Sequence, residues 1–155
     1  MTRKILTGLA LAAALAQQPL AADPVPSKTK APRVEVKLEL SQAPDPIPVG
    51  REATVKIAVT PPRGIALNQY PGITLKLDRS DALRTASNEA FVGTHEPIED
   101  PDKFAFRRID PLVLKVTPTR AGAELSGMLT FFYCVKASGF CAPGKQEVRL
   151  PLRVR

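Results

Sequence analysis

Apolar and polar residues alternate along several stretches of this chain. In residues 33–40, RVEVKLEL, every second residue is apolar and the residues between are charged. A period of two places the apolar side chains on one face, which is typical of a half-buried β-strand. The pattern recurs along the chain, so we predict strands at residues 33–40, 53–59, 73–77, 111–118, 123–135 and 146–154.

Proline-rich connections separate the predicted strands. Residues 41–50, SQAPDPIPVG, contain three prolines, and Pro61 and Pro118 stop the strands that precede them. Because Pro151 has no N–H to donate, we expect the last strand at a sheet edge or with this position facing outward. No apolar period of 3.6 residues persists long enough for a helix. These features predict an all-β fold, an immunoglobulin-like antiparallel β-sandwich.

One long segment departs from the alternating pattern. Asp78–Asp110 is polar and irregular, with short strands expected at most around Phe91 or in residues 104–108, FAFRR. Connections of this length without regular structure are uncommon and are often functional. We therefore expect this segment to contribute to function.

The first 22 residues have the composition of a secretory signal peptide. Arg3 and Lys4 precede the apolar run Ile5–Ala16, and small residues follow. The apolar run is too short to span a bilayer whose hydrocarbon core is roughly 30 Å thick. We expect cleavage after residue 22, a flexible lead-in over residues 23–32, and a domain over residues 33–155. The mature chain is expected to be periplasmic, without insertion into the membrane.

The net charge changes this picture little. The chain carries 22 Lys and Arg against 15 Asp and Glu, and two of the basic residues lie in the predicted signal peptide. The remaining basic residues are scattered and do not alternate with aromatic residues, as they would on a nucleic-acid-binding surface. We therefore expect no nucleic-acid partner.

The two cysteines lie close together at the end of the long strand predicted over residues 123–135. Cys134 and Cys141 flank the segment VKASGF, in which Gly139 favours a turn. In an oxidising compartment such a pair tends to form a disulfide, here across the mouth of a hairpin. The pair is open to three interpretations: a structural staple, a metal clip or a redox device.

The staple and metal interpretations have weaknesses that the sequence exposes. Closing so short a loop is worth roughly 2–3 kcal/mol, toward the low end for disulfides, and a sandwich core should not depend on it. A structural zinc site needs about four ligands, and the only histidine, His95, leaves the cysteines short of that number. We expect no metal and no cofactor, and we expect His95 to be a solvated loop residue.

Thiol–disulfide exchange is favoured by a resemblance. Residues 131–152, FFYCVKASGFCAPGKQEVRLPL, resemble the N-terminal periplasmic domain of the thiol:disulfide interchange protein DsbD, in which a Gly-Phe-Cys-x-Pro stretch holds the second cysteine. Residues 89–93, EAFVG, are similar to the family's acidic, phenylalanine-bearing cap loop. The cysteine spacing is one residue longer than in the best-known members, and Ala90 and Val92 replace an acidic and an aromatic residue.

The resemblance implies a function and roles for four residues. Cys141 would bond to a redox partner and Cys134 would resolve the mixed disulfide, while Glu89 and Phe91 would belong to a cap loop, with the Phe91 ring as a lid over the pair. The partners would be thioredoxin-fold proteins. The family's membrane electron conduit does not follow in this chain, so we expect the reductant to be a separate polypeptide. The protein would be a carrier, with thiol:disulfide interchange as its possible enzymatic activity. The alternative is an exported immunoglobulin-like binding module whose disulfide is purely structural.

Overall fold

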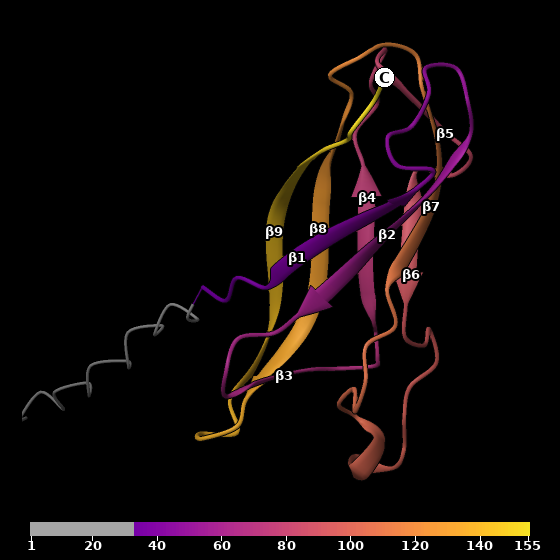
Figure 1. The fold of residues 1–155 in the computed structure, drawn as a ribbon. Helices are drawn as coiled ribbons and strands as arrows, with labels where there is room; N and C mark the ends of the chain where they lie inside the picture. Colours follow the sequence, from indigo (N-terminus) through magenta and orange to yellow (C-terminus); the bar gives the residue numbers. More distant parts are fainter. Residues whose placement is uncertain (1–32) are drawn as a thin grey trace, which may run out of the picture. The chain divides into compact units, whose positions relative to one another are not determined.

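Nine β-strands in two antiparallel sheets build residues 33–155, the part of the chain that the computed structural model describes (Figure 1). The predicted signal peptide and lead-in lie outside these residues. The first sheet has the order β1 (Lys37–Ala43), β2 (Ala53–Thr60), β7 (Leu112–Pro118) and β5 (Leu83–Thr85). The second contains β3 (Ile65–Leu67), β4 (Ile73–Leu77), β6 (Glu89–Val92), β8 (Glu124–Val135) and β9 (Cys141–Pro151).

Strand β8 is the centre of the second sheet. Along its whole length it pairs with β9, from Glu124 opposite Pro151 to Cys134 opposite Cys141. Because β9 occupies one edge of β8, the two strands β4 and β3 share the other edge, one after the other. Strand β6 then pairs with the far edge of β4. The two cysteines thus lie at one end of the longest ladder in the described chain.

The core lies between the two sheets, which makes the fold a β-sandwich. In Figure 1, β1 crosses in front of β8 and β9, and β2 crosses in front of β4. Alternate residues of both sheets are buried, as the period of two requires. The first sheet contributes Val55, Ile57, Leu112, Leu114 and Val116, and the second contributes Ile73, Leu75, Leu125, Leu129, Phe131 and Tyr133.

The alternating pattern located its strands well. Strands β2, β4, β7 and β8 match the predicted segments within one residue at each end, and no α-helix occurs among the described residues. The first strand was predicted four residues too early: Val34 and Val36 are buried, but β1 begins only at Lys37. The last strand begins earlier than predicted, at Cys141, and ends at Pro151.

Two features of the sequence are explained by the position of β9. Within the described chain β9 pairs only with β8, so it is a sheet edge, as Pro151 predicted. Gly144 lies directly opposite Phe131, and a Cβ at this position would collide with the Phe131 ring. The missing side chain therefore allows a large aromatic ring to pack against the β9 backbone.

The long polar segment 78–110 is less irregular than its composition predicted. It contains β5, β6 and a single 3₁₀ turn, η1 (Pro101–Lys103). The Asp100 side chain accepts a hydrogen bond from the Asp102 N–H and so caps this turn. The expected short strand around Phe91 is present as β6, while residues 104–108 form no named strand.

Candidate functional site

The hairpin between β8 and β9 brings the cysteines together. The ladder ends where the Val135 N–H donates to the Phe140 carbonyl at 2.7 Å, and the Gly139 N–H donates to the Val135 carbonyl at 2.8 Å. Gly139 has a φ of +70°, which favours glycine because it has no Cβ. The turn predicted from this glycine is therefore confirmed.

The cysteines form a disulfide across this hairpin, as predicted. Cys134 and Cys141 are directly opposite in the register, and their Cα atoms are 4.0 Å apart. Since the neighbouring pair, Val135 and Phe140, is joined by a ladder hydrogen bond, the cysteines occupy a non-hydrogen-bonded pair, where antiparallel backbones approach most closely. The bond therefore joins positions that the ladder already holds together.

The disulfide lies on the outer face of the sheet. Tyr133 and Ala142 turn into the core, so Cys134 and Cys141, one residue along each strand, turn outward. Cys134 is half-buried, whereas Cys141 is exposed. A thiolate from solution therefore has freer access to the sulfur of Cys141 than to that of Cys134.

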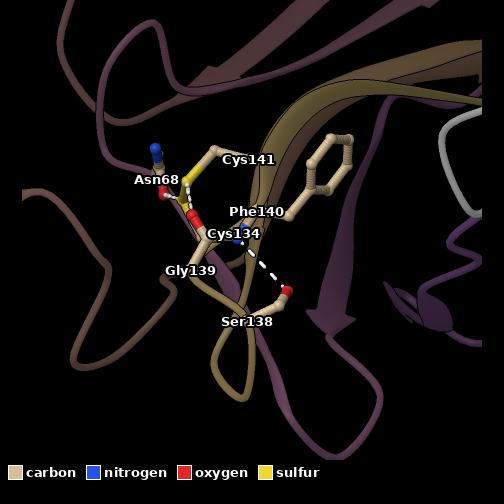
Figure 2. The surroundings of a disulfide bond; sticks show 6 residues. All are labelled: Asn68, Cys134, Ser138, Gly139, Phe140 and Cys141. Carbon is tan, nitrogen blue, oxygen red and sulfur yellow. Dashed lines mark hydrogen bonds between the residues drawn. A yellow bond between two sulfur atoms is a disulfide. The ribbon is translucent and has the colours of Figure 1, made fainter. Parts of the chain in front are cut away.

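An oxygen atom lies next to each sulfur (Figure 2). The Asn68 Oδ1 atom is 3.6 Å from Cys134 Sγ, and the Gly139 carbonyl oxygen is 3.5 Å from Cys141 Sγ. Phe140 extends away from the sulfurs in Figure 2, with 43% of its surface exposed. The two sulfurs thus differ in exposure and in the kind of oxygen beside them.

The backbone fixes the position of Asn68. It follows β3, in which Ala66 is opposite Cys134, so Asn68 is a diagonal neighbour of Cys134 on the same face. The Asn68 N–H donates to the Phe132 carbonyl at 2.9 Å, and Asn68 also forms an antiparallel bridge with Ala105. Its side chain therefore reaches the sulfur from a backbone that is held on both sides.

An apolar hollow of about 320 Å³ lies beside the disulfide. Asn68 belongs to its wall, and Phe132 is two residues before Cys134 on the same face of β8. Much of the Tyr70 and Phe104 surface is exposed to solvent, 39% and 44% respectively. The remaining wall residues are Pro71, Pro97 and Ile98.

The structure does not bring the predicted cap-loop residues to the disulfide. Phe91 is opposite Thr74 on β4, which in turn is opposite Thr130 on β8. Phe91 is therefore two strands across and four residues along from Cys134, roughly 16 Å between Cα atoms by ordinary sheet spacing. Glu89, two residues before Phe91 and opposite Lys76, is farther still.

The Phe91 ring packs elsewhere in this conformation. It stacks on the His95 ring with centroids 3.9 Å apart, and it covers Gly72, where a Cβ would lie 2.5 Å from the ring. Phe91 is half-buried, and His95 is exposed apart from this stacking. The lid over the cysteine pair stays a prediction, and it would require a movement of β6.

Asn68 and the wall of the hollow were not anticipated from the sequence. The strand that leads to Asn68, β3, has only three residues, too few for a visible alternation. Phe132 was visible as an outward-facing residue of a predicted strand, but its neighbours come from segments far away in the chain. An outward aromatic residue two positions before a cysteine was the one local signal.

Comparisons with known proteins identify no relative: no protein-family model matches the chain, and no curated protein matches it significantly. Among residues 33–155, no group of three or more His, Cys, Asp and Glu side chains is arranged to hold a metal ion. The same residues contain no helix long and apolar enough to cross a membrane. The disulfide with its surroundings is therefore the chemical feature on which a functional proposal rests.

Proposed function

We propose that this protein is a thiol–disulfide exchange carrier, which accepts and passes on reducing equivalents through Cys134 and Cys141. The observation that carries the proposal is an exposed cysteine in a disulfide whose two strands are already paired by the sheet ladder. Cys141 is exposed at the hairpin, while the ladder from Glu124 to Cys134 already holds the two strands together. A staple would be expected where it closes a longer loop or joins separate sheets.

The exchange proceeds by attack of a thiolate along the S–S bond. A partner thiolate attacks Cys141 Sγ, a new S–S bond forms to the partner, and Cys134 leaves as a thiolate that takes up a proton. The second thiolate of the partner then attacks the partner's own sulfur in the mixed disulfide. The partner leaves as a disulfide, and Cys141 leaves as a thiolate. Two electrons have passed to this chain, and the reverse sequence passes them onward, with Cys134 resolving the mixed disulfide.

The roles of the cysteines follow the difference in their exposure. Because Cys141 is exposed and Cys134 is half-buried, the mixed disulfide is expected at Cys141. The resemblance to the DsbD N-terminal domain implies the same assignment, together with an immunoglobulin-like fold, a periplasmic location and thioredoxin-fold partners. The hollow, whose wall includes the Asn68 that contacts Cys134, offers such a partner an apolar surface near the disulfide.

A redox titration tests the proposal. The oxidised protein is equilibrated in glutathione buffers of increasing reducing power, and the dithiol fraction is counted by alkylation and mass measurement. Structural disulfides typically have potentials below about −300 mV, whereas exchange-active ones are more oxidising. A potential above that value supports the carrier. A bond that stays oxidised throughout supports the alternative, a binding module whose disulfide is structural.

Trapping of the mixed disulfide identifies the sulfur that is attacked. In Cys134→Ser the resolving thiol is missing. Cys141 of this variant is first activated with an aromatic disulfide reagent and then mixed with reduced thioredoxin whose own resolving cysteine is replaced. A stable mixed disulfide between Cys141 and thioredoxin should accumulate. Cys141→Ser, activated in the same way at Cys134, is the matched control and should react more slowly because its sulfur is half-buried. Equal or reversed rates would contradict the assignment.

A further inference from the structure

We infer that Asn68 is a positioning residue for this exchange: its side-chain oxygen accepts a hydrogen bond from the Cys134 thiol when the pair is reduced. The inference rests on the proposed function and extends it to a residue outside the hairpin. In the oxidised protein Cys134 Sγ has no proton, and the 3.6 Å to Asn68 Oδ1 is a contact. Reduction places a proton on this sulfur, with the acceptor already beside it.

The two sulfurs have different surroundings, so the two thiols should differ in how readily they lose a proton. Cys134 is half-buried, and burial disfavours a charged thiolate. An oxygen acceptor also favours the protonated thiol, so burial and Asn68 act in the same direction at Cys134. Cys141 has the Gly139 carbonyl oxygen 3.5 Å away, but it is exposed, so water stabilises its thiolate. In the reduced protein Cys141 should therefore lose its proton more readily than Cys134.

This difference between the two thiols favours completion of the reduction by the partner over its reversal. When a partner thiolate attacks Cys141, the leaving Cys134 takes up a proton, and the resulting thiol donates a hydrogen bond to Asn68 Oδ1. A protonated Cys134 is a poor nucleophile, so it attacks the mixed disulfide and reverses the step only slowly. The partner's second thiolate then has time to complete the reaction. Asn68 thereby stabilises the dithiol relative to the disulfide.

The first test measures the Cys134 thiol by itself, in Cys141→Ser protein. The alkylation rate is followed as a function of pH with Asn68 present, with Asn68→Ala and with Asn68→Asp. Asn68→Ala should move the midpoint of the profile to lower pH, and Asn68→Asp should move it to higher pH because a carboxylate opposes the thiolate. Asn88→Ala, at the exposed asparagine before β6, is the matched control and should leave the midpoint unchanged.

The pH profile separates positioning from simple covering of the sulfur. If Asn68 only covers Cys134, its removal raises the alkylation rate at every pH and leaves the midpoint in place, which overturns the inference. The Asn68 backbone, which Asn68→Ala keeps, makes the hydrogen bond to Phe132 that holds this residue beside β8, so the variant should fold. If Asn68→Ala does not fold, the test rests on Asn68→Asp, whose alkylation midpoint should move to higher pH.

The second test uses the unaltered cysteine pair at equilibrium with glutathione. Asn68→Ala should shift the dithiol–disulfide equilibrium about two- to fivefold toward the disulfide, the effect of losing one weak hydrogen bond. An equilibrium equal to that of the wild type overturns the role in exchange. A wild-type bond that glutathione cannot reduce, together with the expected pH shifts, overturns the proposed function and leaves the contact between Asn68 and the thiol supported.

Discussion

Two neighbouring residues of β8, Tyr133 and Cys134, show how this fold separates stability from chemistry. Tyr133 faces the core and is only 1% exposed, while Cys134 faces outward beside the hollow. They differ by one position in a strand, and the period of two sends them to opposite faces. The inner face holds the sandwich together, and the outer face at the same end carries the disulfide. Changes on the two faces should therefore have different consequences.

The largest effect on stability is expected on the inner face. Leu129→Ala removes a fully buried side chain between the sheets and should lower the free energy of unfolding by about 2–5 kcal/mol. Met128→Ala, one residue earlier on the outer face, is the control, and its side chain is 36% exposed. It should change stability by no more than about 0.5 kcal/mol. Chemical denaturation of both variants measures the difference, and equal losses would contradict the assignment of the two faces.

The disulfide should contribute less than the core. Replacing both cysteines by serine removes a bond that closes a short loop, and the free energy of unfolding should fall by no more than about 3 kcal/mol. The remaining ten residue pairs of the β8–β9 ladder stay available to hold the hairpin. The double variant should therefore fold, with the circular dichroism spectrum of the wild type. A double variant that cannot fold would show that the bond is a structural staple.

The sequence predicted the inner face better than the outer one. Alternation over eight or more residues located β2 and β8 because burial selects apolar residues at every second position. Strands of three or four residues, such as β3, β5 and β6, are too short to display a period, and two of them interrupt a polar segment. Their positions depend on pairing with strands far away in the chain.

In the candidate site, too, some features could be predicted from the sequence and others could not. The hairpin and its disulfide follow from two cysteines and a glycine within eight residues, so a local reading was sufficient. Asn68 reaches Cys134 across 66 residues of sequence, and nothing in its own neighbourhood marks it. The resemblance directed attention to Phe91 through its local residues EAFVG, while pairing with β4 places that residue two strands from the disulfide.

Phe91→Ala tests whether that residue belongs with the core or with the disulfide. The stacking on His95 and the contact with Gly72 predict a loss of stability below about 3 kcal/mol, less than for a fully buried phenylalanine. They also predict an unchanged rate of disulfide reduction by glutathione. His95→Ala is the control, since it removes the stacking partner and leaves the Phe91 ring. A faster reduction in Phe91→Ala, with little loss of stability, would establish the lid.

The smallest effect on stability is expected at the wall of the hollow. Phe104 lies on the surface with 44% of its area exposed, so Phe104→Ala should change the free energy of unfolding by about 0.5 kcal/mol or less. If a partner covers the hollow during exchange, the same variant loses apolar contact area in the docked complex and should react more slowly with reduced thioredoxin, by about tenfold. Its reaction with dithiothreitol, which is too small to cover the hollow, should keep the wild-type rate.

Val113→Ala is the matched control for Phe104→Ala. Val113 is an exposed apolar residue of β7, in the other sheet, and 52% of its surface is accessible. Its replacement should leave both reduction rates unchanged. If Phe104→Ala also keeps the wild-type rate with thioredoxin, the hollow takes no part in docking, and the exposed sulfur of Cys141 is sufficient for the partner. If Phe104→Ala reacts more slowly with thioredoxin and with dithiothreitol to the same extent, Phe104 affects the disulfide itself. A selective loss with the protein reagent extends the functional surface from the sulfur to the aromatic residues beside it.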